Sequence, residues 1–433
     1  MDSIWMDCSL PPFPPLEGDI STDVLVIGGG MAGLLTAYLL QDAGVGVMLA
    51  EADRIGMGIT RNTTAKITSQ HGLCYSTLAS QFRPETAGQY LRANEEALAR
   101  FRTMCRQIDC DFEEQENYIY SRSDRRVLEE ELYTLDTLGF SAELAEELPL
   151  PFPTVGAVRF PNQAQFHPLK FLSSVAKDLK IFENTTVRQL QGTTALCDHG
   201  RIRAEKIIVA THFPFLNKHG SYFLKLYQQR SYCLSLEGIP EWEGMYLDEQ
   251  ENGLSFRRYG KICILGGGGH RTGKSGGGWK ELEAFVKRYY PHAKITRRWA
   301  TQDCMSLDGI PYIGQYSTAT PDLFVATGFN KWGMTSSMVA AGLLRDQILG
   351  KENPYTDLFS PSRSMLHPQL GTNLLESTKN LLTPTAPRCP HLGCALKWNQ
   401  QEHSWDCPCH GSRFGEDGKR IDNPATGDLK KRS

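Results

Sequence analysis

The sequence has no uninterrupted apolar run of 18 residues, no excess of basic residues and no basic, apolar leader. The most apolar stretch, residues 24–40, contains four glycines and is typical of a strand, turn and helix, so no membrane span is expected. Lys and Arg number 46 against 49 Asp and Glu, which argues against nucleic-acid binding. The acidic, proline-rich start lacks the features of a signal peptide. We therefore expect a cytoplasmic protein.

The composition is that of a globular protein, and its cysteines are unevenly placed. With 433 residues, 40% of them hydrophobic and 22% charged, the chain is long enough for two to three domains. Eight of the twelve cysteines are scattered between Cys8 and Cys304. The other four fall within 21 residues near the end, together with His391 and His410. Without an export signal, such a cluster favours a metal site over a disulfide scaffold.

The N-terminal segment predicts a dinucleotide-binding βαβ unit. The apolar run 22–27 ends in G-x-G-x-x-G, a helical stretch follows, and a second strand ends at Glu51. Gly28 permits the tight turn, Gly30 lets the backbone approach a pyrophosphate, and Gly33 allows close packing of helix on strand. The helix N-terminus then faces the phosphates, and Glu51 can hydrogen-bond the adenosine ribose. A glycine-rich turn without a ligand is the alternative.

The remaining sequence indicates how the chain is divided. Residues 84–109 and 124–138 have helical spacing, and 201–211 is a further strand. Residues 322–350 repeat the pattern of strand, glycine-containing turn and long helix. The region between these strands, 221–300, is rich in aromatic and alternating stretches, which favours an inserted substrate domain. The Pro/Ser-rich segment from Lys351 to Arg388 is interpreted as a linker.

One sequence pattern matches a P-loop nucleotide site without the helix that such a site needs. Residues 268–275 match the P-loop pattern G-x-x-x-x-G-K-[ST] after an apolar strand. A P-loop needs a helix that starts at the lysine, whereas three glycines follow here, and glycine is a poor helix former. ATP binding is therefore not expected.

The sequence resembles the D-amino-acid-oxidase-like FAD oxidoreductases, which include glycine and sarcosine oxidases. The similarity extends over residues 20–350: the stretch EADRIGMGITRNTTAKITSQHG after the second strand, Trp299-Ala300, DGIPYIG at 308–314 and GFNKWGM at 328–334. QAQFHP at 163–168, GGGGHRTGK at 266–274 and the cysteine-rich tail resemble the subfamily in which this flavoprotein is fused to a Rieske iron–sulfur domain.

The resemblance implies FAD rather than NAD, and it implies a set of cofactor-binding positions. Those at the ADP half are Gly28, Gly30, Gly33, Glu51 and Arg54, with Val187 near the adenine and Ala210 and Thr211 beside the pyrophosphate. Those along the ribityl chain and the ring are Thr60, Thr63, Thr64, Ala65 and Lys66. The turn with Gly328, Lys331, Gly333 and Met334 leads into a helix whose N-terminus would face the pyrimidine edge of the flavin and stabilise negative charge there. Lys66 and Lys331 as plain surface lysines are the alternative.

Two departures from the family concern the substrate and oxygen. Glycine oxidase has a carboxylate-binding Arg where this chain has Asp303, and an aspartate suits a cation or a neutral polar group. Sarcosine oxidases have an oxygen-activating Lys four residues before an active-site His; if His270 is that histidine, the lysine position is Gly266. We expect His270, Arg271 and Asp303 in the substrate pocket, although a packing role for His270 and Arg271 in a glycine loop is an alternative.

The tail carries C-x-H-x-x-C followed by C-x-C-H. A Rieske centre uses two thiolates on one iron and two imidazoles on the other. The resemblance to Rieske proteins assigns Cys389, His391, Cys407 and His410 as ligands, and it places Cys394 and Cys409 for a disulfide between the loops. Structural zinc is the competing interpretation. The similarity covers 388–429 without the strands that usually precede the first ligand loop, so we expect this small fold to dock on the flavoprotein or on a second subunit.

The expected fold is mixed α/β. Residues 1–350 are expected to form an FAD-dependent oxidoreductase of two interleaved parts. A Rossmann-like FAD domain comprises about 20–75, 150–215 and 300–350. An inserted antiparallel substrate domain comprises about 76–149 and 216–299. A linker (351–387) and a small all-β Rieske-type module (388–433) follow. The expected function is that of a dehydrogenase that takes a hydride from a small amine-like substrate and passes electrons through the [2Fe–2S] cluster to a carrier such as a ferredoxin or flavodoxin. An oxidase that uses O₂ and a redox-sensing protein with a structural metal are the alternatives.

Overall fold

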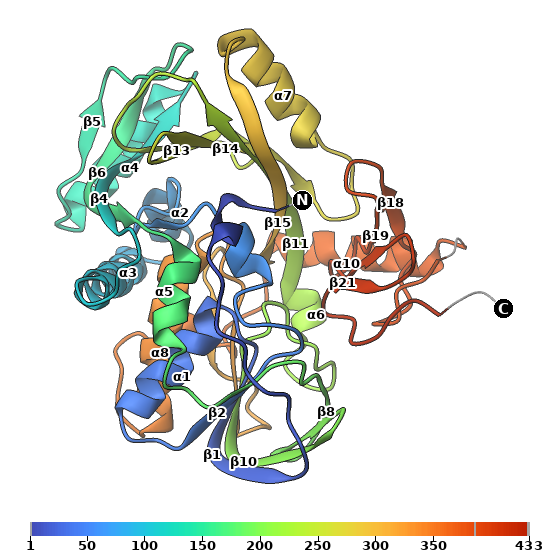
Figure 1. Ribbon diagram of the computed structural model, residues 1–433. Helices are drawn as coiled ribbons and strands as arrows, with labels where there is room; N and C mark the ends of the chain where they lie inside the picture. The colour runs from blue at the N-terminus through green and yellow to red at the C-terminus, as the bar shows by residue number, and fades with distance from the viewer. Residues whose placement is uncertain (1, 385–386, 431–433) are drawn as a thin grey trace.

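The computed structural model describes residues 2–384 and 387–430 and contains three β-sheets (Figure 1). Two large sheets lie in the first 350 residues, and a small sheet lies near the C-terminus, on the right in Figure 1. Among the described helices, none is both long and apolar enough to cross a membrane.

The first sheet is the predicted nucleotide-binding sheet. Its path runs β16-β17-β10-β1-β2-β7, in which the neighbours from β17 to β7 are parallel and β16 is antiparallel. The hairpin β8–β9 pairs with β10 at the side. The strands are β1 Ile20–Ile27, β2 Val47–Ala50, β7 Ile181–Phe182, β8 Val187–Gln191, β9 Thr194–Cys197, β10 Gly200–Val209, β16 Tyr312–Gln315 and β17 Leu323–Thr327.

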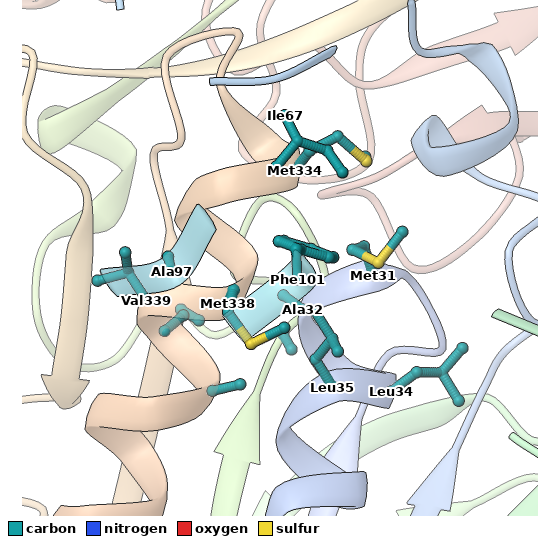
Figure 2. Packing of buried hydrophobic residues seen from close by; sticks show 14 of the residues in the cluster. Met31, Ala32, Leu34, Leu35, Ile67, Ala97, Phe101, Met334, Met338 and Val339 are labelled. Carbon is teal, nitrogen blue, oxygen red and sulfur yellow. The ribbon is translucent and has the colours of Figure 1, made fainter. Parts of the chain in front are cut away.

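Helices α1 (Met31–Asp42) and α8 (Gly333–Ile348) pack together against this sheet, and α3 (Pro84–Cys105) packs on α8. Each of the two follows a glycine-containing turn after a strand, as the repeated sequence pattern predicts. Alanine, leucine and methionine side chains of α1 and α8 meet Phe101 of α3 in the main hydrophobic core (Figure 2). This core fixes the N-terminal ends of α1 and α8 on the same side of the molecule.

The second sheet is mixed and larger than the sequence predicts. Its order is β15-β11-β14-β13-β12-β4-β6-β3, with β5 beside β6 and only β12–β4 parallel. β6, expected in the FAD domain, belongs here because it pairs along its length with β4. The strands are β3 Lys66–Ile67, β4 Glu113–Ser121, β5 Glu143–Ala145, β6 Gly156–Gln165, β11 Leu226–Glu237, β12 Met245–Asp248, β13 Ser255–Tyr259, β14 Ile262–Arg271 and β15 Lys294–Ser306.

Further helices cover the sheets or connect them. They are the 3-10 helices η1 Ile4–Asp7 and η2 Ile59–Asn62, and the α-helices α2 Cys74–Gln81, α4 Arg125–Thr137, α5 Pro168–Val175, α6 Tyr222–Lys225 and α7 Gly278–Tyr289. α7 begins four residues after Lys274, and the Lys274 ammonium pairs with Glu376 at 2.5 Å. The P-loop pattern is thus a strand end followed by a glycine turn.

The segment expected as a linker is partly helical. It contains α9 (Thr356–Phe359) and α10 (Pro368–Leu382), and α10 packs on α6. A proline at the first turn of α10 and His367 as its N-cap explain where this helix begins. The small antiparallel sheet follows, with β18 Lys397–Asn399, β19 Ser404–Asp406, β20 Arg413–Gly415 and β21 Arg420–Asp422. Residues 387–430, with this sheet, are called the C-terminal module below.

Candidate functional site

A single large cavity of about 1210 Å³ connects the first sheet, the second sheet and the C-terminal module. At one end it is lined by the glycine loop after β1 and by Glu51 at the end of β2. Its walls include β11, β14 and β15 of the second sheet, and Arg420 to Asn423 of the C-terminal module reach its surface. A dinucleotide cradle and the cysteine-rich module therefore border the same space.

The glycine loop has the close approaches that the motif predicts. Gly28 has φ +111°, and a Cβ there would lie 2.5 Å from the carbonyl oxygen of Ala210. A Cβ on Gly33 would lie 1.9 Å from the carbonyl oxygen of Gly28, so helix and turn can touch only because residue 33 is a glycine. Gly30, the N-cap of α1, has only the Thr60 hydroxyl near its Cβ position and no side-chain cap. The Met31 amide of the first turn donates to the Thr60 hydroxyl at 3.1 Å, and Gly30 and Met31 line the cavity, so this helix end faces the space where a phosphate site is expected.

Glu51 and Arg54 hold the loops at this end. One carboxylate oxygen of Glu51 accepts a hydrogen bond from the Gly29 amide at 2.6 Å, and the other accepts one from the Asp53 amide at 2.9 Å. Burial raises the pKa of Glu51, and these amide donors oppose the shift. Arg54 donates to the carbonyl oxygen of Leu10 at 2.8 Å.

The middle of the cavity is formed by the segment after η2. The indole of Trp5 in the N-terminal arm donates to the carbonyl oxygen of Thr63 at 2.8 Å and fixes this segment from behind. The ammonium of Lys66 donates to the carbonyl oxygen of Tyr246 at 3.2 Å. Burial, together with the nearby Arg257, lowers the pKa of Lys66 to about 7. Lys66 is thus an enclosed lysine on the cavity wall rather than a plain surface lysine.

The wall opposite carries acidic groups and a second open helix end. Asp303 on β15 accepts a hydrogen bond from Ser231 at 3.2 Å, and burial raises its pKa while Lys331 opposes that shift. The Lys331 ammonium donates to the carbonyl oxygen of Glu251 at 2.9 Å, and Glu251 also lines the cavity. α8 begins at Gly333 without a side-chain cap, and its first turn faces the cavity.

Most of the predicted cofactor positions line this cavity. The fourteen that do are Gly28, Gly30, Glu51, Arg54, Thr60, Thr63, Thr64, Lys66, Val187, Ala210, Thr211, Lys331, Gly333 and Met334. The other three are backbone positions behind the wall: Gly33 contacts Gly28, while Ala65 and Gly328 have φ +55° and +72°.

Two of the three predicted pocket residues lie elsewhere. Asp303 lines the cavity, whereas His270 and Arg271 do not. Gly266, Gly267 and Gly269 of β14 form the wall instead, and Nε2 of His270 lies 3.0 Å from the hydroxyl of Tyr232, which lines the cavity. The Arg271 guanidinium lies over the ring of Tyr227, 4.9 Å from its centroid. The sequence identified the strand but not which of its side chains face the cavity.

The cysteine and histidine residues of the tail converge in the C-terminal module. Cys389, Cys407 and His410 are buried, His391 is half-buried, and the His391 and His410 rings lie 4.9 Å apart. The sulfurs of Cys394, Cys407 and Cys409 lie within 4.8 Å of one another, and all four cysteines of the module are free.

The imidazoles of this group have buried nitrogens that need a partner. Within the described residues, both ring nitrogens of His410 and Nδ1 of His391 are buried without a hydrogen bond. Burial lowers the pKa of His391 to about 4 and that of His410 to about 3, so both rings are neutral, the form that binds metal. Buried orphan nitrogens beside free thiols are what a two-histidine, two-cysteine cluster site requires.

Residues outside the C-terminal module contact its two ligand loops. The side chain of Asn217, in the loop after β10, lies 2.7 Å from Nε2 of His391 and leaves Nδ1 as the metal-facing atom. Gln228 of β11 donates to the carbonyl oxygen of His410 at 2.8 Å, and Gln302 of β15 donates to that of Gly411 at 2.9 Å. The ligand loops are therefore held from outside the module as well as from within.

A buried ion network joins the same two regions. Arg230 of β11 donates through Nε to Glu402 at 3.0 Å, and Arg413 donates to the other oxygen of Glu402 at 2.7 Å. Burial alone would raise the pKa of Glu402, but the two arginines outweigh it and lower the pKa to about 2. Arg230 also lines the cavity, so the network reaches from the cavity wall into the module.

The loop after β10 connects the cavity with the histidines. Thr211 lines the cavity, and Phe213 two residues later lies 6.4 Å from the His391 ring and 6.1 Å from the His410 ring, between centroids. Asn423 of the module donates to the carbonyl oxygens of Thr211 and Phe213, the latter at 2.9 Å. The two candidate cofactor sites are thus adjacent.

This fold and these sites define a flavoprotein oxidoreductase joined to an iron–sulfur module. Residues 23–347 match the family model "FAD dependent oxidoreductase", and residues 372–432 match the "Rieske [2Fe-2S] domain" model. The chain belongs to the FAD-dependent oxidoreductase family and carries a C-terminal Rieske domain. It is an FAD-dependent oxidoreductase, and the two families define its cofactors as FAD and a [2Fe–2S] cluster.

Individual relatives agree with this architecture. The chain is 34% identical to the Bacillus subtilis (strain 168) protein named "Putative Rieske 2Fe-2S iron-sulfur protein YhfW", over 97% of this chain and 95% of the relative. It is 25% identical to gamma-glutamylputrescine oxidoreductase of Escherichia coli (strain K12), over 78% of this chain and 86% of that protein. Glycine oxidase from Geobacillus kaustophilus shares the fold at TM-score 0.68 and 18% identity, over 80% of this chain and 99% of that one.

The comparisons confirm the predicted family, fold class and cofactors. The Rieske match begins at residue 372, inside α10, and so includes residues before the predicted module at 388–433. Sequence reasoning missed the supports of the module: Asn217, Gln228, Gln302 and Arg230. No sequence signal marks them: Asn217 lies in a loop, and the strands β11 and β15 that carry the other three contain many polar residues.

Proposed function

We propose that this protein is a dehydrogenase of a small amine-like substrate and that it exchanges electrons with a carrier protein through its cluster. FAD in the cavity would accept a hydride equivalent from a carbon next to the amine nitrogen, and the [2Fe–2S] cluster would carry electrons singly. In this proposal Gly28, Gly30, Glu51 and Thr211 hold the ADP half, and Lys66 and the N-terminus of α8 face the ring. Cys389, His391, Cys407 and His410 hold the cluster.

One observation carries the proposal: the cavity and the histidine pair share the loop 211–213 as a wall. Thr211 borders the cavity, while Phe213 contacts both histidine rings. A cluster in this position lies beside the cofactor cavity without any rearrangement of the module. A redox sensor has no need of a substrate cavity, whereas this one is open enough for FAD and a further small molecule.

The charges of the cavity favour an amine over a simple amino acid. Arg230 on the cavity wall is paired with Glu402, and the carboxylates of Asp303 and Glu251 also line the cavity. These carboxylates would hold an ammonium group, and Ser231 keeps Asp303 oriented toward the space. The relative named gamma-glutamylputrescine oxidoreductase supports the same substrate class.

The test is an anaerobic screen of small primary and secondary amines against the holoprotein, read at the flavin absorbance and by EPR of the cluster. The proposal expects bleaching of the flavin followed by the appearance of a reduced Rieske signal within the same chain. An amine that bleaches the flavin while the cluster stays oxidised, with rapid reoxidation by air and release of peroxide, would instead establish an oxidase. The variant Asp303→Asn is expected to raise KM for the amine more than tenfold while FAD remains bound.

A further inference from the structure

Helix α10 has a polar side and an apolar side. Its polar side faces the protein, and its leucines face outward. Asn373 and Asn380 are its buried residues, and Asn373 donates to the carbonyl oxygen of Leu224 at 3.0 Å. Leu375 and Leu382, on the opposite side, are 74% and 77% exposed, and Leu374 and Leu381 are 44% and 45% exposed. A helix covering a domain normally buries such a stripe.

These leucines are part of a local concentration of exposed apolar side chains. Of the eleven large hydrophobic residues that are exposed in the described chain, six fall within residues 366–392. One of them is Leu392, which follows His391 directly in the first ligand loop. We define the leucine face as Leu374, Leu375, Leu381, Leu382 and Leu392. Such a contiguous apolar patch marks an interaction site.

The leucine face is continuous with the cluster site. The guanidinium of Arg388 donates to the carbonyl oxygen of Leu381 at 3.2 Å and to that of Gly393 at 2.7 Å. The amide of Ala395 donates to the carbonyl oxygen of Asn380 at 2.9 Å. The end of α10 and the first ligand loop are therefore one unit, and a partner on the leucine face lies beside half-buried His391.

The charge around the face is positive. Within residues 366–398, Lys379, Arg388 and Lys397 are exposed, and the one carboxylate, Glu376, is paired with Lys274 of the flavoprotein. The loop that carries Asn217 adds exposed Lys218 next to His391. Since the whole chain has a formal charge of -3, this positive patch is a local feature.

We propose that the leucine face and the basic side chains around it form the docking surface for a small acidic electron-carrier protein. This rests on the proposed function and names where its carrier binds. Each encounter moves one electron between the carrier and the cluster, so two encounters balance one two-electron turnover in the cavity. A second copy of the chain fits less well, because its own Lys379 and Arg388 would meet like charges across a two-fold axis and would cover the cluster edge.

The experiment uses the full-length holoprotein and an acidic plant-type [2Fe–2S] ferredoxin as the probe. Binding is measured by titration calorimetry at 20 mM and 200 mM NaCl. Electron transfer is measured by mixing reduced ferredoxin with oxidised holoprotein and following the cluster signal. That direction is downhill, since plant-type ferredoxins have lower reduction potentials than Rieske clusters.

Two variants test the surface and two control for general effects. Leu375→Ser/Leu382→Ser is expected to weaken ferredoxin binding about tenfold. Lys379→Glu is expected to weaken it about fivefold at 20 mM NaCl and less at 200 mM, since salt screens the charge. The controls lie far from the cluster. Tyr133→Ser on α4 removes an exposed large apolar side chain (Tyr133 is 77% exposed), and Lys177→Glu, at an exposed site after α5, reverses a lysine charge; both are expected to leave binding unchanged.

The outcomes separate this proposal from the function on which it rests. Equal ferredoxin binding by wild type and the leucine variant overturns the docking surface, even where amine-dependent reduction of the cluster proceeds. Sedimentation of wild type as a dimer that the leucine variant dissociates also overturns it, in favour of a second copy. Loss of ferredoxin binding in the two surface variants, with iron content and flavin bleaching by amine unchanged, establishes it. If the holoprotein fails to oxidise amines, the proposed function is wrong, but the ferredoxin-binding result still decides whether the docking surface exists.

Discussion

The flavoprotein and the C-terminal module are stabilised in different ways. The flavoprotein has a large contiguous core in which α1, α3 and α8 interlock, and its cofactor loops rest on buried strands. The module has a core of seven buried residues, four of which are its own cysteines (Cys389, Cys394, Leu396, Cys407, Cys409, Phe414 and Ala425). It therefore depends on its metal and on the surface it docks against, whereas the flavoprotein depends on neither.

The largest difference is expected when a cluster ligand is removed. His410→Ala removes one of the two imidazole ligands of the histidine-bound iron, so the cluster should be lost, and iron and sulfide should fall to background while FAD stays near one per chain. Metal analysis and flavin absorbance measure both quantities on one sample. Cys197→Ser, at a half-buried free cysteine of β9, is the matched control and should keep its iron. Joint loss of iron and FAD from His410→Ala would show that the two regions do not hold their cofactors independently.

The next effect concerns the buried ion network. Glu402 and Arg230 have side chains 8% and 2% exposed, and Glu402→Gln leaves Arg230 and Arg413 buried without this carboxylate. We expect the module to lose about 3–5 kcal/mol, seen as iron released at lower urea concentration than unfolding of the flavoprotein. Arg230→Met should cost less, because Glu402 keeps Arg413.

The control for this network is a surface ion pair of the same module. His403 and Glu416 are both more than two-thirds exposed, so Glu416→Gln should change stability by less than about 0.5 kcal/mol. A Glu402→Gln protein that releases iron at the same urea concentration as wild type would refute the role of the network.

A change confined to the flavoprotein should alter pH dependence without touching the cluster. With its pKa near 7, Lys66 is charged below that pH and neutral above it, and positive charge favours electron gain by the flavin. Flavin reduction by amine should therefore slow about tenfold as pH rises through 7, beyond the titration of the amine itself. Lys66→Met should be slow at all pH values and lose this step, with an unchanged Rieske EPR signal. A step of the same size in Lys66→Met would assign it to another group.

The smallest effect tests a single hydrogen bond between the regions. Asn217→Ala removes the partner of Nε2 of His391, a loss of about 1 kcal/mol, and should speed iron release to a chelator about fivefold. Asn217→Asp retains an acceptor at this position and should release iron at nearly the wild-type rate. Equal release by Asn217→Ala and wild type would show that this bond does not hold the loop.

The features that were predicted from the sequence are those formed by residues close together in the chain. The glycine loop after β1, the strand–turn–helix of β17 and α8, and the two ligand loops each lie within a few consecutive residues, and the family resemblance ordered them. The orientation of His270 was not predictable, because neighbouring strand residues face opposite sides and a bulge in β14, where Gly268 and Gly269 lie opposite Ser231 of β11, shifts the register. The leucine side of α10 was also missed, since helical periodicity gives a face but does not show whether that face is inward.

The contacts between the flavoprotein and the C-terminal module could not be predicted from the sequence, for a different reason. Arg230 and Glu402 are 172 residues apart, and Gln302 and Gly411 are 109 apart. No local pattern connects them, and each residue alone is consistent with an exposed polar position. The expectation that the module docks followed from its small size, whereas the surface it uses came only from the structure.

The most direct test is the metal and flavin content of anaerobically purified protein, with an EPR spectrum after reduction. The account predicts about one FAD, two irons and two sulfides per chain and a Rieske-type signal, since a two-cysteine, two-histidine [2Fe–2S] centre gives that stoichiometry. FAD together with zinc, or with no metal, would contradict it and leave a flavoenzyme with a structural tail.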